Sequence, residues 1–132
     1  SDSGKAANNL INEIKITINI CSNHEDQKLQ EMGIRLSKSL VCLESACNWM
    51  LKQEDFNNRL AGATPFLKAF GFILGANYLV KAAIKTGALD RKSLAEFYCL
   101  NILPEMEANV VMSQSGQRSL YNFTDNFFGF VQ

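Results

Sequence analysis

Histidine is almost absent from this chain: among 132 residues only His24 occurs, in the stretch SNHEDQ. A metal site built from several imidazoles is therefore excluded. Glu25 and Asp26 follow His24 directly, and their negative charges would repel an incoming phosphoryl group, so a phosphotransfer histidine is disfavoured as well. We expect His24 to be an exposed, solvated side chain in a turn.

Cysteine pairs at metal or redox spacing are also missing, because Cys21, Cys42, Cys47 and Cys99 form no CxxC motif. Thiolate catalysis needs a base beside the sulfur, and the single imidazole lies about five helical turns from Cys42. We predict that the thiols are small buried hydrophobes, in a chain that resides in a reducing, cytoplasmic compartment.

An excess of charge of either sign is missing too. Thirteen basic residues balance thirteen acidic ones, and no basic block occurs. The electrostatic signature of a protein that binds nucleic acid or an anionic membrane surface is therefore absent, and we expect no nucleic-acid partner.

No apolar run is long enough for a membrane span. The longest uncharged stretch, AFGFILGANYLV, covers residues 69–80 and is bounded by Lys68 and Lys81, whereas a span needs about 20 apolar residues. Gly71 and Gly75 lie within this stretch, and each costs about 1 kcal/mol relative to alanine in a helix. We predict that another helix backbone comes near them.

Convincing strand alternation is absent, and apolar residues recur instead at helical spacing. A first helix is predicted over residues 5–20. A second is predicted from an N-cap at Ser22 or Asn23, with Glu25 completing a capping box, to about residue 52. Its buried seam is predicted to consist of Leu29, Gly33, Leu36, Leu40, Leu43, Cys47 and Met50.

Two further helices follow. The third is predicted to begin either in QEDFNN or at Thr64–Pro65, and to stop at Gly87 as a left-handed cap. The fourth is predicted to begin at an Asp90 cap, to be kinked at Pro104 and to end near Gly116. Its buried side is predicted to consist of Leu94, Phe97, Tyr98, Leu100 and Val111.

Long helices joined by short connections favour antiparallel neighbours. We therefore predict an all-α fold, an antiparallel up-down-up-down four-helix bundle, as a single domain over residues 1–132. Residues 117–132 form a short aromatic C-terminal tail of this domain. The predicted core includes Leu36, Leu40, Leu43 and Phe97.

No arrangement of polar residues assembles an active site. Glu105 and Glu107 are two positions apart, so they point to different sides of a helix and are expected to be a solvated face. No glycine-rich phosphate loop follows a strand, because no strand is predicted. We predict that no residue of this chain is catalytic, holds a cofactor or binds a metal.

Two long stretches carry a resemblance to a known family. CNWMLKQEDFNNRLAGATPFLKAFGFILGANYLVKAAI resembles the helical domain appended at the C-terminus of large bacterial acyl-CoA dehydrogenases, with Phe66 and Lys68 as mild departures from its Tyr and Arg. AEFYCLNILPEMEANVVMSQSGQRSL resembles that domain's aromatic pair, Leu-Pro kink and glycine before a short tail. The resemblance covers residues 45–120, and its matching positions in the first stretch are Trp49, 61–65, Leu67, Phe70 and Gly71.

The resemblance implies that the chain is excised from the C-terminus of a longer flavoenzyme. Such an enzyme binds FAD and oxidises an acyl-CoA thioester between the carbons α and β to the carbonyl. In that family the flavin pocket and the glutamate base belong to upstream domains, so no position here inherits either role. The implied partners are these upstream catalytic domains and a second subunit in a homodimer. Family members act on fatty acyl groups or on short sulfur-containing ones such as methylmercaptopropionyl-CoA, and this sequence does not distinguish them.

Two classes of function remain. The chain is the accessory packing domain of a flavoenzyme, or it is a stand-alone helical module for protein–protein interaction without enzymatic activity. An upstream reading frame that encodes a flavin-binding domain distinguishes them.

A docking surface is predicted on the third helix. At about 100° per residue, one sector of this helix carries Asn77, Lys81 and Lys85, which we expect to face solvent. The same sector continues backwards through Leu67, Phe70 and Leu74. The side that faces the bundle is predicted to hold Phe66, Ile73, Leu79, Val80 and Ile84.

A four-helix bundle cannot cover both sides of one helix. We therefore hypothesise a surface that docks the catalytic domains or a second subunit, consisting of Leu67, Phe70 and Leu74 together with Tyr121, Phe123, Phe127 and Phe128 of the tail. In the alternative, the third helix is central and is buried all round by its own chain.

Overall fold

The computed structural model describes residues 2–112 and 114, and all regular structure among them is helical. The elements are α1 (Asp2–Ser22), α2 (Gln27–Leu51), α3 (Phe56–Thr86), α4 (Leu89–Phe97) and a π-helical turn, η1 (Tyr98–Ile102). Residues 103–112 continue as α-helix, and we call α4, η1 and these residues the fourth helix. The predicted all-α class with four long helices is confirmed for the described residues, and the aromatic tail lies outside them.

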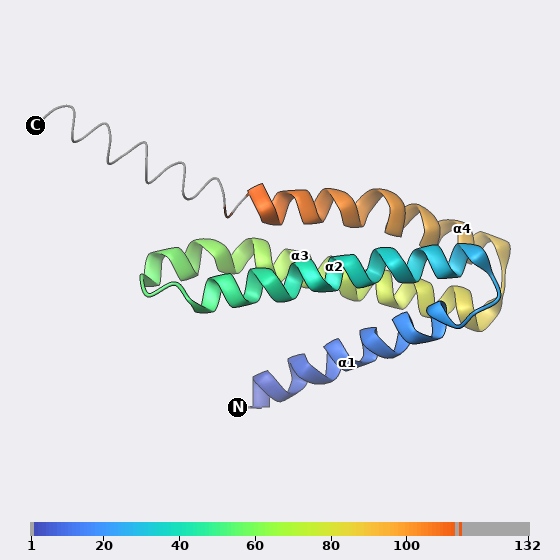
Figure 1. The fold of residues 1–132 in the computed structure, drawn as a ribbon, viewed down its shortest axis with the longest axis horizontal. Coiled ribbons are helices and arrows are strands. Elements are labelled where there is room, and N and C mark those ends of the chain that lie inside the picture. Colours follow the sequence, from blue (N-terminus) through green and yellow to red (C-terminus); the bar gives the residue numbers. More distant parts are fainter. Residues whose placement is uncertain (1, 113, 115–132) are drawn as a thin grey trace, which may run out of the picture.

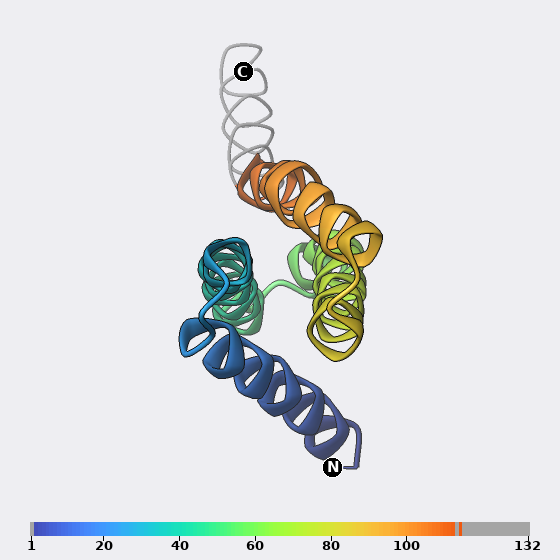
Figure 2. The same ribbon diagram turned by 90° about the vertical axis from the view of Figure 1, so that its right-hand side faces the viewer.

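The four helices do not form a closed ring. α2 and α3 lie side by side, and the connection between them lies at the opposite end of the molecule from the other two connections (Figure 1). Viewed end-on, α1 and the fourth helix lie on opposite sides of the α2 and α3 pair (Figure 2), and no Cα atom of α1 lies within 8 Å of one in α4 or η1. Towards its N-terminus α1 diverges from the pair. α2 and α3 are therefore central, and α1 is peripheral and held mainly by α2.

The predicted seam of α2 is confirmed at Leu29, Gly33, Leu36, Leu40 and Leu43, which are buried, but not at Cys47 and Met50, which are only partly buried near the end of the helix. Its predicted cap is wrong, since the N-cap is Asp26, whose carboxylate accepts the N–H of Lys28 at 2.9 Å. Ser22 instead closes α1, and its hydroxyl donates to the carbonyl of Ile18 at 2.9 Å. A carboxylate at a helix N-terminus is favoured by the helix dipole, and Asp26 lies far enough along the chain to leave room for the turn.

α3 begins at the earlier of the two predicted places. Asp55 is its N-cap, and its carboxylate accepts the N–H of Asn57 at 2.8 Å, so Pro65 lies inside the helix. The predicted left-handed end is confirmed, because Gly87 has φ 62° and donates its N–H to the carbonyl of Ala83 at 3.0 Å.

α4 begins two residues earlier than predicted. Its N-cap is Ala88, whose N–H is accepted by the hydroxyl of Thr86 at 3.2 Å. Asp90 lies in the first turn and accepts the N–H of Arg91. The left-handed Gly87 turns the chain so sharply that the next helix starts at once, which leaves Asp90 inside it.

A kink was predicted at Pro104, and the structure has the π turn η1 just before it. Because Pro104 has no N–H for the carbonyl of Leu100, the helix widens before it, and the N–H of Leu103 reaches back five residues to the carbonyl of Tyr98. The buried side of the fourth helix is then Ala95, Cys99, Leu103, Met106 and Val110.

This buried side corrects the predicted one. Tyr98 is partly buried against the core, as predicted. Phe97, which was predicted to lie in the core, is 59% exposed. Leu94, Leu100 and Val111, which were also predicted to be buried, are exposed as well. The small side chains of Ala95 and Cys99 allow the fourth helix to approach its neighbours closely, and the bulky row is left on the outside.

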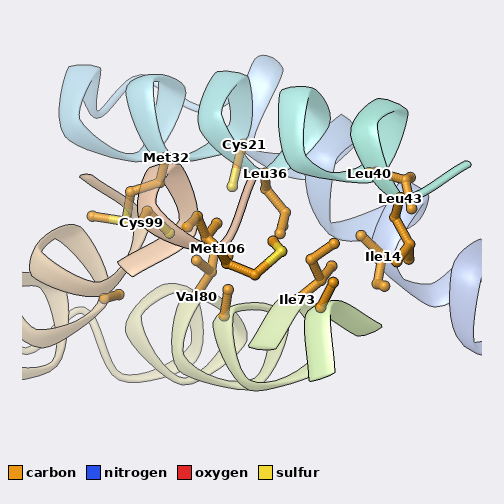
Figure 3. Close-up of a cluster of buried hydrophobic side chains, with 14 of the residues drawn as sticks. Ile14, Cys21, Met32, Leu36, Leu40, Leu43, Ile73, Val80, Cys99 and Met106 are labelled. Atoms are coloured by element: carbon orange, nitrogen blue, oxygen red, sulfur yellow. The ribbon is translucent and has the colours of Figure 1, made fainter. Parts of the chain in front are cut away.

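One core joins all four helices (Figure 3). α1 contributes Ile14 and Cys21, α2 its leucines and Met32, α3 Ile73 and Val80, and the fourth helix Cys99 and Met106. The predicted inner side of α3 is confirmed, because Ile73 and Val80 are fully buried and Phe66, Leu79 and Ile84 pack against the cluster.

Gly71 and Gly75 of α3 do not lie against another helix backbone. No atom lies within 4 Å of a Cβ built on Gly71, so the predicted close approach is wrong there. At Gly75 the neighbour is a side chain: the Cβ would lie 3.0 Å from the hydroxyl oxygen of Tyr98, which donates to the carbonyl of Phe72 at 3.0 Å.

One helix in the described part of the chain is long and apolar enough to cross a membrane, namely Ala63–Thr86 within α3, with mean hydropathy 1.3. The core helix of a bundle passes the same test, so this is weak evidence. α3 contacts α1, α2 and α4. The absence of a membrane span stays a prediction.

Candidate functional site

The predicted docking residues lie on α3 in two different environments. Leu67 is 66% exposed, whereas Phe70 and Leu74 are partly buried and pack against the core. The rings of Phe66 and Phe70 are tilted against each other, with centroids 6.3 Å apart. Among the described residues, α3 is therefore not buried all round. The tail residues of the predicted surface lie outside the described residues.

Two grooves flank α1, and they separate these residues. The first, which we call the N-terminal groove, has a volume of about 580 Å³ and is lined by α1, α2 and α3, including Leu67 and Phe70. The second lies between α1 and α3, has a volume of about 590 Å³ and includes Leu74. The structure thus brings Leu67 and Phe70 together and places Leu74 in a different groove.

The solvent-facing sector predicted on α3 is wrong at Asn77. Lys81 and Lys85 are exposed, but Asn77 is only 6% exposed, and its Oδ1 has no hydrogen-bond partner. Glu13 and Ile20 of α1 line the same groove as Asn77, so α1 covers this part of α3. The periodicity of one helix could not reveal where a neighbouring helix crosses it.

The thiols behave as packing groups. Cys21 and Cys99 are fully buried, as predicted, and burial raises their pKa to about 11 and about 12. Burial and the nearby Glu107 also raise the pKa of Cys42. Cys42 and Cys47 are only half-buried, which departs from the prediction, and Cys47 lines the N-terminal groove.

His24 is not the free, solvated side chain that was predicted. It is half-buried, and its Nδ1 accepts the N–H of Asp26 at 3.0 Å. Its carbonyl accepts from the side-chain amide of Gln30 at 2.6 Å. His24 therefore holds the turn between α1 and α2, and because its partner for Nδ1 is a backbone N–H, no particular residue type signals this role in the sequence.

A polar cluster joins α2 to the fourth helix. Glu107 accepts from Arg35 at 3.2 Å and from the buried hydroxyl of Ser39 at 2.5 Å. Glu107 is therefore not part of a solvated face as predicted, although Glu105 is exposed. Arg35 Nε has no partner. The cluster fixes two helices to each other and presents no free base or nucleophile.

Metal-binding clusters were sought among the described residues, and no group of three or more histidine, cysteine, aspartate or glutamate side chains could hold an ion. The described surface has three apolar features: two grooves beside α1 and an outward row of large side chains on the fourth helix. Such features are typical of contacts between proteins or domains.

Comparison with known proteins gives one match. No curated protein and no solved structure matches the chain. The model of one protein family, described as acetyl-CoA dehydrogenase C-terminal like, matches residues 10–124, which is most of the sequence. The chain belongs to the acetyl-CoA dehydrogenase C-terminal-like family.

Proposed function

We propose that this chain is the accessory C-terminal packing domain of an FAD-dependent acyl-CoA dehydrogenase in the cytoplasm. In this proposal the domain is an antiparallel four-helix bundle with an aromatic tail, and it packs against the upstream catalytic domains and a second subunit. The observation that carries the proposal is the family match over residues 10–124. The parent enzyme performs α,β-dehydrogenation of an acyl-CoA thioester.

The described residues do not fit FAD. A dinucleotide pyrophosphate binds most readily at a helix N-terminus, where free N–H groups point at the anion. Here Asp26 and Asp55 occupy the N-termini of α2 and α3 with their own carboxylates, and Asp90 adds a negative charge to the first turn of α4. These carboxylates would repel a pyrophosphate. This agrees with the resemblance, which implies that the flavin pocket and the catalytic base belong to the upstream domains, and we assign both to them.

The outward row of the fourth helix supports a packing role. Leu94, Phe97 and Leu100 are exposed on one part of this helix, and Val111 and Met112 are exposed near its end. The same helix buries a different row in the core, so it is apolar on two sides. Large apolar side chains that line an outer face are typical of a surface that another domain covers.

The parent reading frame provides the test. We expect several hundred upstream residues with a flavin-binding domain. The parent protein would be expressed intact and with residues 10–124 removed, and its flavin absorbance, oligomeric state and thermal stability measured. Activity would be assayed with fatty acyl-CoA and methylmercaptopropionyl-CoA. We expect the shortened enzyme to keep the residues that bind flavin but to lose stability and subunit assembly.

A matched pair of variants in the intact parent sharpens this test. Phe97→Ser should weaken assembly, whereas Ile34→Ser, at an equally exposed position on α2, should leave it unchanged. The 132-residue chain alone should be colourless and should dehydrogenate no acyl-CoA. If no flavin-binding domain precedes the chain, the proposal fails and the alternative of a stand-alone interaction module stands. Tight FAD binding by the isolated chain would equally contradict it.

A further inference from the structure

The groove between α1 and α3, which we call the α1–α3 groove, has the size of a site for a small molecule. Its volume is about 590 Å³, and protein pockets that bind small ligands measure about 300–1,000 Å³. Its apolar lining includes Ile20 of α1 and Leu74 and Ile84 of α3. Ligand sites combine such a lining with a few polar groups that orient the ligand. The polar groups of this groove therefore indicate which ligand would fit.

The amide of Asn77 is the most buried polar group of the α1–α3 groove. Asn77 is only 6% exposed, whereas every other polar residue that lines the groove is exposed. Buried polar groups are nearly always hydrogen-bonded, yet Asn77 Oδ1 has no partner. The terminal torsion of an asparagine side chain is soft, so this amide can turn towards the groove. Asn77 Oδ1 is therefore a free acceptor for a ligand that carries an N–H or O–H group.

Two lysines continue the polar lining of the groove along α3. Lys81 and Lys85 are exposed, and neither forms an ion pair with a described residue. They follow Asn77 by four and eight residues, which places them about 6 and 12 Å further along the helix axis. A ligand with a hydrogen-bond donor at one end and an anionic group at the other matches this spacing.

Glu13 of α1 limits the charge that the ligand can carry. It lines the groove opposite α3, is exposed and forms no ion pair with a described residue. The ionised side chains of the groove are thus two lysines and one glutamate. One anionic group is balanced by the lysines, but a ligand with several phosphate groups would bring negative charge towards Glu13. The lining therefore favours a monoanion over a nucleotide.

We propose that the α1–α3 groove binds a small organic monoanion with an apolar body, whose N–H or O–H group donates to Asn77 Oδ1 and whose acid group binds Lys81 and Lys85. The apolar body packs against Ile20 and Leu74. α1 is otherwise held mainly by α2, so a ligand in this groove fixes α1 to α3 as well. Binding to the folded chain then raises its melting temperature.

Two synthetic probes test the parts of this proposal. In 6-anilinonaphthalene-2-sulfonate, an N–H group and a sulfonate lie at opposite ends of an apolar ring system. Its phenoxy analogue has an ether oxygen in place of the N–H, so it keeps the charge but cannot donate. The dissociation constants of both probes for the 132-residue chain would be measured by isothermal titration calorimetry. We expect the anilino probe to bind about fivefold to tenfold more tightly, because only this probe can donate to Asn77 Oδ1.

Variants of the groove assign this binding to residues. Asn77→Leu should bring the two probes to equal affinity, because the acceptor is gone. Lys81→Gln/Lys85→Gln should weaken both probes about fivefold, because two exposed cations are removed. The matched control is Lys38→Gln/Lys52→Gln, which removes the same charge at exposed positions outside the groove and should leave both constants unchanged. The melting temperature of each variant without probe shows that it is folded.

Equal affinities of the two probes for the native chain would overturn the proposal, and so would binding of the anilino probe that is weaker than millimolar. An equal loss of affinity in Lys81→Gln/Lys85→Gln and in Lys38→Gln/Lys52→Gln would also overturn it, because the net charge of the chain would then attract the sulfonate. An unchanged melting temperature at saturating anilino probe would show that the probe does not fix the folded state, which contradicts the role given to the ligand.

Discussion

Gly33 of α2 lies directly against Cys21 of α1: a Cβ built on Gly33 would come within 2.6 Å of the Cβ of Cys21. The carbonyl oxygen of Ile18 would be 3.6 Å away. Both Gly33 and Cys21 are buried. This contact is where α1 is fixed to α2, since α1 diverges from the bundle towards its N-terminus (Figure 1).

Gly33→Ala should therefore destabilise the protein, although alanine is usually the better helix former. The added methyl group overlaps the Cβ of Cys21, and overpacking of this kind costs about 1–3 kcal/mol. The measurement is the free energy of unfolding from a denaturant titration. Gly71→Ala is the matched control: nothing lies within 4 Å of its Cβ, so it should gain about 0.5–1 kcal/mol. Equal effects at the two glycines would contradict the close contact at Gly33.

Leu43→Ala should cost about 2–5 kcal/mol, because it removes apolar burial and leaves a cavity. Leu43 is fully buried in the cluster that joins α1, α2 and α3 (Figure 3). The control is Val41→Ala on the exposed side of the same helix, which should change the free energy of unfolding by less than about 0.5 kcal/mol. An unchanged melting temperature for Leu43→Ala would remove Leu43 from the core.

Asn77→Leu should stabilise the protein by about 1–2 kcal/mol. Asn77 Oδ1 is buried without a partner, and an unpaired buried polar atom carries a desolvation penalty that leucine does not have. Thr17→Val provides the contrast, because the buried hydroxyl of Thr17 donates to the carbonyl of Glu13 at 3.2 Å and its loss should not stabilise. A loss of stability in Asn77→Leu would mean that a water molecule or a partner satisfies the amide.

The sequence predicted several features that one helix decides by itself, although it misplaced the N-caps of α2 and α4. The spacing of leucines along α2 predicted its buried side, and Gly87 predicted the end of α3, because only glycine adopts a positive φ without strain. It also predicted the inner residues Ile73 and Val80 of α3.

Features that depend on two helices could not be predicted in this way. The fourth helix has two apolar rows. The row around Ala95 and Cys99 is buried because its small side chains let the helix approach its neighbours closely. The row around Phe97 has bulkier side chains and was therefore predicted to be the buried one, but it is exposed. Asn77 is buried because α1 crosses α3 there. The grooves themselves arise from the angle of α1, which no local pattern encodes.

The turn between α1 and α2 is held to the fourth helix by a charged pair. Lys92 Nζ and Asp26 Oδ2 are 2.6 Å apart, and the same carboxylate accepts the N–H of Lys28. These two hydrogen bonds, that of Lys92 first, lower the pKa of Asp26 below its ordinary value of 3.8. Burial raises it, but to a smaller extent.

Asp26→Asn should make stability less dependent on pH. Because the pKa of Asp26 is lower in the folded state than in the unfolded state, its stabilising contribution is complete above pH 3.8 and is lost as the pH falls through the folded-state value. Asparagine still caps the helix through its one carbonyl oxygen, so the change removes the charge and the hydrogen bond from Lys92. The melting temperature should be lower than that of the native chain at about pH 7, and the difference should narrow in acid. Lys92→Gln should behave in the same way, because it removes the other half of the pair. A difference that stays constant between about pH 7 and pH 2 would show that the charge of Asp26 does not stabilise this turn.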